Sequence, residues 1–193
     1  MRVLAVSDTH DNILAVKAIL DIIRSERPEV ILHCGDYISP FTIRMLCGHN
    51  TTILGVWGNN DGDKQTILDI IMGEGFTIDS QPREIMLDGT RVLLIHGWKN
   101  PEKTKKIVHA IARGGKYDIV LYGHTHQVDV SIVKDGNVEV LGIKNEYVLS
   151  RDDFDVLILN PGEACGWLTG RGTVMLLDIS ERIAIRILDV FSM

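Results

Sequence analysis

The sequence has few cysteines and no long hydrophobic run. Its three cysteines, Cys34, Cys47 and Cys165, are odd in number and share no short spacing, so neither a disulfide framework nor a zinc knuckle is expected. No apolar stretch reaches the roughly 20 residues that a membrane-spanning helix needs, and no signal segment is expected in the opening residues. We therefore expect a cytoplasmic protein that does not bind a membrane.

The chain also lacks an excess of positive charge. Its 20 lysines and arginines stand against 26 acidic residues, which gives a net charge of -6 at neutral pH. A basic surface for nucleic acid is therefore not expected. An anionic substrate would need a local positive centre, and a bound metal ion would supply one. At 193 residues and 45% hydrophobic content, the chain is predicted to form one globular domain without repeats.

Short β-branched runs alternate with helical patterns through the first two thirds of the chain, and the remainder is mostly β. Strands are predicted within 2–7, 29–36, 51–59 and 117–127, and near 156–159, 173–179 and 183–190. Helices are predicted within 11–27 behind an Asp11 cap, near 41–47 and 64–72, and within 100–115 behind an Asn100 cap. Asp-Gly pairs at 88–89 and 135–136 predict hairpins. This order predicts an α/β fold of two packed sheets flanked by helices.

Polar side chains follow five of the predicted strands, at the point where each strand ends. The segments are Ser7–His10, Cys34–Asp36, Gly58–Asp61, His96–Gly97 and Gly123–His126. Because the carboxyl ends of strands in an open α/β sheet border the ligand-binding crevice, these five loops are expected to converge. In extended backbone, residues two apart point the same way, so Asp8 and His10 are expected to aim at one point, as are His124 and His126.

Each of these residues has an ordinary structural interpretation. An isolated His-X-His pair often makes interior hydrogen bonds, Asp8 fits a helix cap, and Asn59 fits a turn. Seven metal-capable side chains at five successive strand ends are harder to attribute to capping and turns. The set mixes nitrogen and oxygen donors without thiolate, which favours Mn²⁺, Fe, Zn²⁺, Co²⁺ or Ni²⁺ over Ca²⁺.

The ordered set of short motifs resembles that of the calcineurin-like metallophosphoesterases. The motifs are "DTH", "GD", "GNND", "HG" and "GHTH", and "NPGEACGWLTG" (160–170) resembles the closing motif of the small, single-domain phosphodiesterase branch, which includes retromer-subunit-like proteins. The resemblance implies a four-layer αββα sandwich of two mixed sheets. It also implies two divalent transition-metal ions, with Mn²⁺ favoured and Ni²⁺, Zn²⁺, Fe or Co²⁺ as alternatives.

The resemblance assigns the ligands residue by residue. It implies that Asp8, His10, Asp36 and His126 bind the first metal, that Asp36 bridges to the second, and that Asn59, His96 and His124 complete the second. Two such ions hold a bridging hydroxide for in-line attack on a phosphoryl group. A small phosphoester is the expected substrate.

One residue departs from the pattern of many phosphatases in the family. Where they have a histidine after "GN", this chain has Asn60, and an amide cannot act as a general acid near neutral pH. We therefore predict a catalytic role for Asn60 in phosphate binding and a preference for diesters or good leaving groups. The alternative is that Asn60 only shapes the turn.

Other candidate residues receive structural interpretations. His33 in a strand, His109 on a helix and Cys34 are predicted to be core or structural residues, and His49 a surface residue. The lysines near the His96 loop fit either a phosphate-attracting rim or a solvated helix face; they are Lys99, Lys103, Lys105 and Lys106. Glu163, Cys165 and Asp61 receive no chemical role.

The segment near 134–153 is longer than the corresponding link in the branch that the chain resembles. We predict a hairpin insertion there that covers substrate or contacts a second copy of the chain. The function predicted overall is a metal-dependent phosphodiesterase. A phosphomonoesterase of the same fold and a non-catalytic scaffold are the alternatives, and fold alone does not name a substrate.

Overall fold

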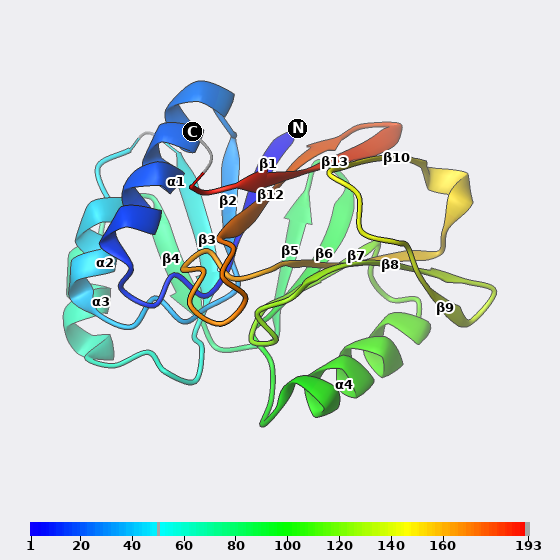
Figure 1. Cartoon of the computed structure of the whole chain (residues 1–193), viewed down its shortest axis with the longest axis horizontal. Coiled ribbons are helices and arrows are strands. Elements are labelled where there is room, and N and C mark those ends of the chain that lie inside the picture. The colour runs from blue at the N-terminus through cyan, green and yellow to red at the C-terminus, as the bar shows by residue number, and fades with distance from the viewer. Residues whose placement is uncertain (50, 192–193) are drawn as a thin grey trace.

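The computed structural model, which describes residues 1–49 and 51–191, contains two mixed β-sheets flanked by helices, as predicted (Figure 1). The first sheet has the order β10 (Glu146–Ser150), β13 (Arg182–Asp189), β12 (Thr173–Ile179), β1 (Arg2–Val6), β2 (Val30–His33), β3 (Thr52–Val56) and β4 (Phe76–Asp79). The second has the order β5 (Arg83–Leu87), β6 (Thr90–Ile95), β7 (Ile119–Tyr122), β11 (Val156–Pro161), β8 (Val128–Lys134) and β9 (Asn137–Val140).

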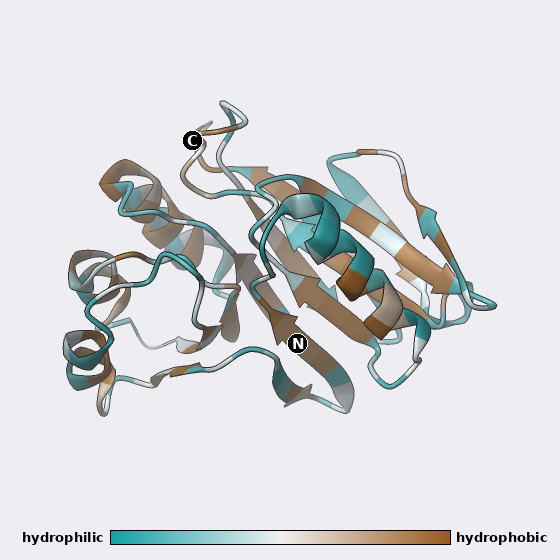
Figure 2. Cartoon of the chain, turned by 90° about the horizontal axis from the view of Figure 1, so that it is seen from below, coloured by the Kyte–Doolittle hydropathy of each residue, from teal (hydrophilic) through white to brown (hydrophobic). Residues whose placement is uncertain are grey.

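The two sheets pack face to face and helices cover their outer faces. Along β1, Val3 and Ala5 enter the cluster between the sheets, whereas Leu4 and Val6 face the opposite way. That outer face packs against α1 (Ile13–Glu26), α2 (Pro40–Leu46) and α3 (Lys64–Ile71). The outer face of the second sheet packs against α4 (Pro101–Arg113). The result is four layers, with mostly hydrophobic strands between helices whose outer faces are hydrophilic (Figure 2).

Local sequence signals explain most element boundaries. The side chain of Asn100 accepts a hydrogen bond from the Lys103 backbone N–H, so the predicted cap of α4 is confirmed. Both Asp-Gly pairs join antiparallel strands, β5 with β6 and β8 with β9. The predicted Asp11 cap of α1 is wrong. Asn12 caps the helix by accepting from Leu14 and Ala15, and the Asp11 carboxylate instead accepts from the Thr42 hydroxyl.

The segment from 134 to 153 joins both sheets. Its first part closes the β8–β9 hairpin of the second sheet, and its later part, β10, pairs with β13 of the first sheet. Whether this segment is an insertion into a single domain stays a prediction. In the part of the chain that the structure describes, no helix has the length and hydrophobicity to cross a membrane. The cytoplasmic location also stays a prediction.

Candidate metal centre

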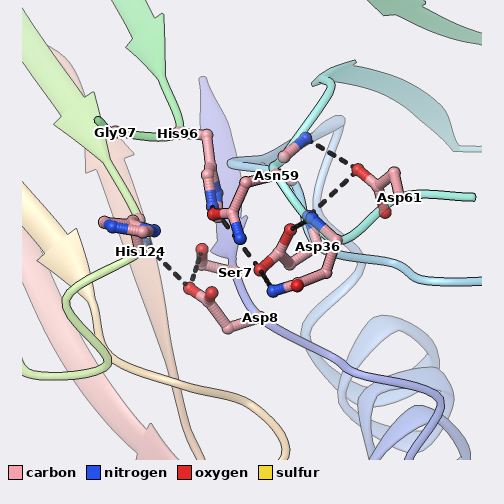
Figure 3. Close-up of polar contacts among 12 residues, drawn as sticks. Ser7, Asp8, Asp36, Asn59, Asp61, His96, Gly97 and His124 are labelled. Carbon is pink, nitrogen blue, oxygen red and sulfur yellow. Dashed lines mark hydrogen bonds and ion pairs between the residues drawn. The ribbon is translucent and has the colours of Figure 1, made fainter. Parts of the chain in front are cut away.

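The five predicted loops converge at one end of the sandwich. β1, β2 and β3 run parallel in the first sheet and β6 and β7 run parallel in the second, so the loops that follow them leave at their carboxyl ends. Figure 3 shows the result, with Asp8, Asp36 and Asn59 from the first sheet facing His96 and His124 from the second. His10 and His126 lie beside Asp8. The structure therefore brings all seven predicted ligands to one place.

One group of ligand atoms centres on Asp8. The Asp8 Oδ1 atom lies 3.6 Å from His10 Nε2 and 3.4 Å from His126 Nε2, and the two imidazole rings lie 5.2 Å apart between centroids. Asp8 is fully buried, and its Oδ2 atom accepts hydrogen bonds from the Ser7 hydroxyl and the His124 backbone N–H. Burial raises the pKa of Asp8, but His10, His96 and His126 together lower the pKa below its usual range. Asp8 is therefore an ionised ligand candidate.

A second group centres on Asp36. Its Oδ2 atom lies 3.5 Å from His10 Nε2 and 3.5 Å from His96 Nε2, so this carboxylate stands between the two groups. The Asn59 amide oxygen lies 2.9 Å from His96 Nε2. The His124 ring packs edge-on against the His96 ring at 5.0 Å, and His124 Nε2 lies 3.3 Å from the Lys99 carbonyl oxygen.

Hydrogen bonds on the far side of two rings determine where their protons lie. Glu163 accepts from His126 Nδ1 at 2.8 Å, and the Cys34 carbonyl accepts from His96 Nδ1 at 2.8 Å. Burial raises the pKa of Glu163, but bonds from His126 and Thr169 lower it to about 2, so this carboxylate can only accept. Both Nδ1 atoms therefore carry the proton, and in the neutral rings both Nε2 atoms present lone pairs to carboxylate oxygens.

These facing acceptors fit a bound metal ion. Asp8 Oδ1 and His10 Nε2 are buried without any hydrogen-bond partner, which is costly unless a cation binds there. Metal ions bind such ligands at about 2.0–2.2 Å, so two ligands of one ion lie roughly 3.0–3.6 Å apart. The four separations between Nε2 and carboxylate atoms, 3.4 to 3.6 Å, lie within that range. The donor chemistry and the spacing therefore agree.

The backbone at these ligands differs from the prediction. Asp8, His10, Asp36, His124 and His126 all have positive φ, between 45° and 67°, which non-glycine residues rarely adopt. The extended geometry predicted for Asp8–His10 and His124–His126 is therefore wrong. Because of this backbone, His126 joins Asp8 whereas His124 packs against His96. Strained conformations of this kind cluster at functional sites, where the surrounding structure maintains them.

Two carboxylates without a predicted role support the site. Asp61 accepts from the backbone N–H groups of Asp36, Ile38 and Gly58, and so fixes the two ligand loops to each other. The loops touch so closely that a Cβ on Gly58 would lie 2.1 Å from Asp36 Oδ1. Glu163 orients His126 across 37 residues of sequence. Histidines that bind a metal commonly donate their second ring N–H to a carboxylate. The presence of Glu163 in the closing motif is the sequence signal that could have indicated this role.

Asn60 lies at the edge of the centre and is exposed. Its backbone N–H donates to Asp36 Oδ1 at 2.9 Å, and its side-chain amide donates to Asp36 Oδ2 at 2.7 Å. The residue therefore contacts a candidate ligand through donors alone.

Two of the other histidines discussed above lie in secondary-structure elements. His33 is buried against Tyr37 and accepts from the Gly35 N–H, and His109 lies on α4.

Sequence and structure comparisons give one consistent result. The calcineurin-like phosphoesterase superfamily domain matches residues 1–182. Phosphodiesterase MJ0936 of Methanocaldococcus jannaschii is 32% identical over 186 residues, which cover 94% of this chain and 95% of that protein. A solved archaeal phosphodiesterase is similar with a TM-score of 0.77 and 29% identity, over 98% of this chain and 99% of that one.

More distant structures share the fold. A Vps29 mutant from Entamoeba histolytica has a TM-score of 0.64 at 19% identity, over 98% of this chain and 99% of that one. The E. coli phosphoesterase Yfce has a TM-score of 0.61 at 18% identity, over 92% and 88%. The match over residues 1–182 and the 32% identical relative assign the family. The chain belongs to the calcineurin-like phosphoesterase superfamily.

Proposed function

We propose that the protein is a metal-dependent phosphodiesterase that acts on a small-molecule or nucleotide phosphodiester. One observation carries the proposal: the Nε2 atoms of His10, His96 and His126 meet carboxylate oxygens at 3.4–3.6 Å, while the Nδ1 atoms of His96 and His126 already donate to other acceptors. A cation resolves that arrangement. The 32% identity to a phosphodiesterase supports the same activity.

The proposed ligands are those that the sequence motifs name. Asp8, His10 and His126 would hold one ion, and Asn59, His96 and His124 the other, with Asp36 between them. A pair of divalent ions supplies charge that polarises a phosphoryl group and a nucleophile near neutral pH. Asn59 would add a neutral oxygen, so it does not increase the negative charge that faces an anionic substrate. Glu163 would keep the His126 Nε2 lone pair directed at the site.

The assay that tests this function compares a diester with the matching monoester. Protein stripped of metal and reloaded with Mn²⁺, Ni²⁺ or Zn²⁺ is mixed with bis(p-nitrophenyl) phosphate and, separately, p-nitrophenyl phosphate. We expect the diester to be hydrolysed faster, with Mn²⁺ the most effective ion. Faster monoester hydrolysis would support the phosphomonoesterase alternative. No hydrolysis with any ion would support a scaffold.

Asn60 is proposed to determine the preference for diesters. Its amide can donate a hydrogen bond to a phosphate oxygen, as it now donates to Asp36, but it cannot protonate an alkoxide leaving group. We expect Asn60→His to raise the rate of phosphate release from glycerol 2-phosphate by about 10²-fold, the lower end of what general acid catalysis contributes. The rate is measured with Mn²⁺-loaded protein.

Asn60→Gln is the matched control, because it keeps an amide that cannot supply a proton. It should not gain activity on glycerol 2-phosphate. If Asn60→His and Asn60→Gln hydrolyse that substrate equally slowly, Asn60 only shapes its turn and the proposed role is wrong.

A further inference from the structure

Trp167 is an exposed aromatic residue beside the candidate metal centre. The centroid of its ring lies 6.1 Å from that of His10, with the planes tilted by 36°. Trp167 is 63% exposed, whereas Trp57 and Trp98 are partly buried and pack against hydrophobic clusters. An indole that contacts a ligand candidate and keeps most of its surface in solvent has surface available for a bound molecule.

The loop that carries Trp167 is tied to the centre. Glu163, which bonds to His126, also accepts from the Leu168 backbone N–H at 2.9 Å and the Thr169 hydroxyl at 2.7 Å. On the other side of the loop, the Asn12 amide donates to the Cys165 carbonyl at 2.8 Å. Figure 1 shows this loop, between β11 and β12, beside the segment that leads into α1. The chain directly after Trp167 is therefore held by the same carboxylate that orients a ligand candidate.

A cavity adjoins the same half of the centre. It has a volume of about 310 Å³ and is lined in part by His126, Val128, Ile143, Thr169, Arg171 and Thr173. This volume lies at the lower end of the roughly 300–1,000 Å³ of small-molecule sites. Apolar side chains, hydroxyl groups and a guanidinium share the lining, and Thr169 follows Trp167 by two residues. A substituent attached to a phosphate at the metal centre would find both the Trp167 ring and this cavity on the side of the centre that contains His10 and His126.

We propose that Trp167 is a stacking platform for an aromatic substituent of the substrate, and that this substituent is a nucleobase. Bases stack on tryptophan through their faces, so an exposed indole selects for an aromatic group without specifying which base. The mixed apolar and polar lining of the adjoining cavity suits a nucleoside better than an alkyl group. The proposal rests on the proposed function for the placement of the phosphate, and it narrows the substrate to nucleotide phosphoesters.

The experiment compares two ligands that differ only in the base. Adenosine 5′-monophosphate and ribose 5-phosphate are titrated calorimetrically into Mn²⁺-loaded protein, so the measurement does not depend on turnover. We expect wild-type protein to bind the nucleotide about 10-fold more tightly, within the range of stacking one base. Trp167→Ala should reduce this ratio to about one, and Trp167→Phe should retain most of it.

Leu168→Ala is the matched control, because Leu168 is 75% exposed on the same loop and offers no aromatic face. It should keep the wild-type ratio. A second measurement localises the base: the nucleotide should quench tryptophan fluorescence in wild-type protein and not in Trp167→Phe, which keeps Trp57 and Trp98. Failure of the nucleotide to bind, equal wild-type affinity for both ligands, or an unchanged ratio in Trp167→Ala would each overturn the proposal. If the protein binds the nucleotide more tightly than ribose 5-phosphate but hydrolyses no phosphoester, the base subsite stands and only the proposed phosphodiesterase activity is wrong.

Discussion

Asp36→Asn is expected to lower kcat/KM for bis(p-nitrophenyl) phosphate by about 10³-fold or more. Asp36 is buried, and its Oδ2 atom is equally distant from His10 Nε2 and His96 Nε2, at 3.5 Å. The substitution keeps the shape of the side chain and removes the charge between the two proposed ions. A loss of about 4 kcal/mol in transition-state stabilisation, which corresponds to about 10³-fold, is within what metal centres contribute.

The measurement pairs steady-state kinetics with metal analysis of the purified protein. Asp63→Asn is the matched control, because the same change falls two residues after Asp61 on an exposed residue whose side chain makes no cap hydrogen bond. The control should stay within about two-fold of wild type. Full activity in Asp36→Asn with two bound ions per chain would show that this carboxylate does not bridge the site.

Metal removal is expected to change stability as well as activity, and the effect of Asp36→Asn on Tm is expected to have opposite signs with and without metal. An ion present at 100 times its Kd stabilises the folded state by about 2.7 kcal/mol, so chelation should lower the Tm of wild-type protein. Without metal, Asp8 and Asp36 are two buried carboxylates close enough to share one ion with His96. The histidines that lower the pKa of Asp8 offset part of the repulsion between the two carboxylates, and we expect the remainder to destabilise the apo protein.

Asp36→Asn relieves that repulsion. We therefore expect the apo variant to melt at a higher temperature than apo wild type, and the Mn²⁺-loaded variant to melt at a lower temperature than loaded wild type. Thermal unfolding with and without chelator measures all four values. A variant that melts lower than wild type in both states would contradict the view that the carboxylates need a cation, and would indicate a purely structural role for Asp36.

Much of the fold follows from local sequence signals. The alternation of Val3 and Ala5 with Leu4 and Val6 predicts a strand buried on both faces, and each Asp-Gly pair predicts its hairpin, because these signals act over a few residues. The short strand β4 is not among the predicted strands, although "FTID" alternates apolar and polar residues, because four residues are the shortest run that such a pattern can mark; the strand pairs with β3. The crossing of β10 into the other sheet is a long-range pairing that no local signal specifies.

The sequence predicts which residues form the site but not how they are arranged in space. Seven polar residues after strand ends indicate a shared crevice because sheet topology alone brings those ends together. Five of the seven have a left-handed backbone, and contacts between segments far apart in sequence, such as those of Asp61 with the loops of Asp36 and Gly58, support it. The separation of His124 from His126 follows from that backbone. The hydrogen bond from His126 to Glu163 depends on the pairing of β11 with β7 and β8.

The division of the ligands between the sheets links metal retention to the integrity of the sandwich. Asp8, His10, Asp36 and Asn59 follow strands of the first sheet, whereas His96, His124 and His126 follow strands of the second. The groups around Asp8 and around Asp36 each draw atoms from both sheets. Neither sheet alone therefore presents either group of ligands, and separation of the two hydrophobic faces would break both groups together. The rate at which bound ions exchange with solution would then report how often the two halves of the molecule part.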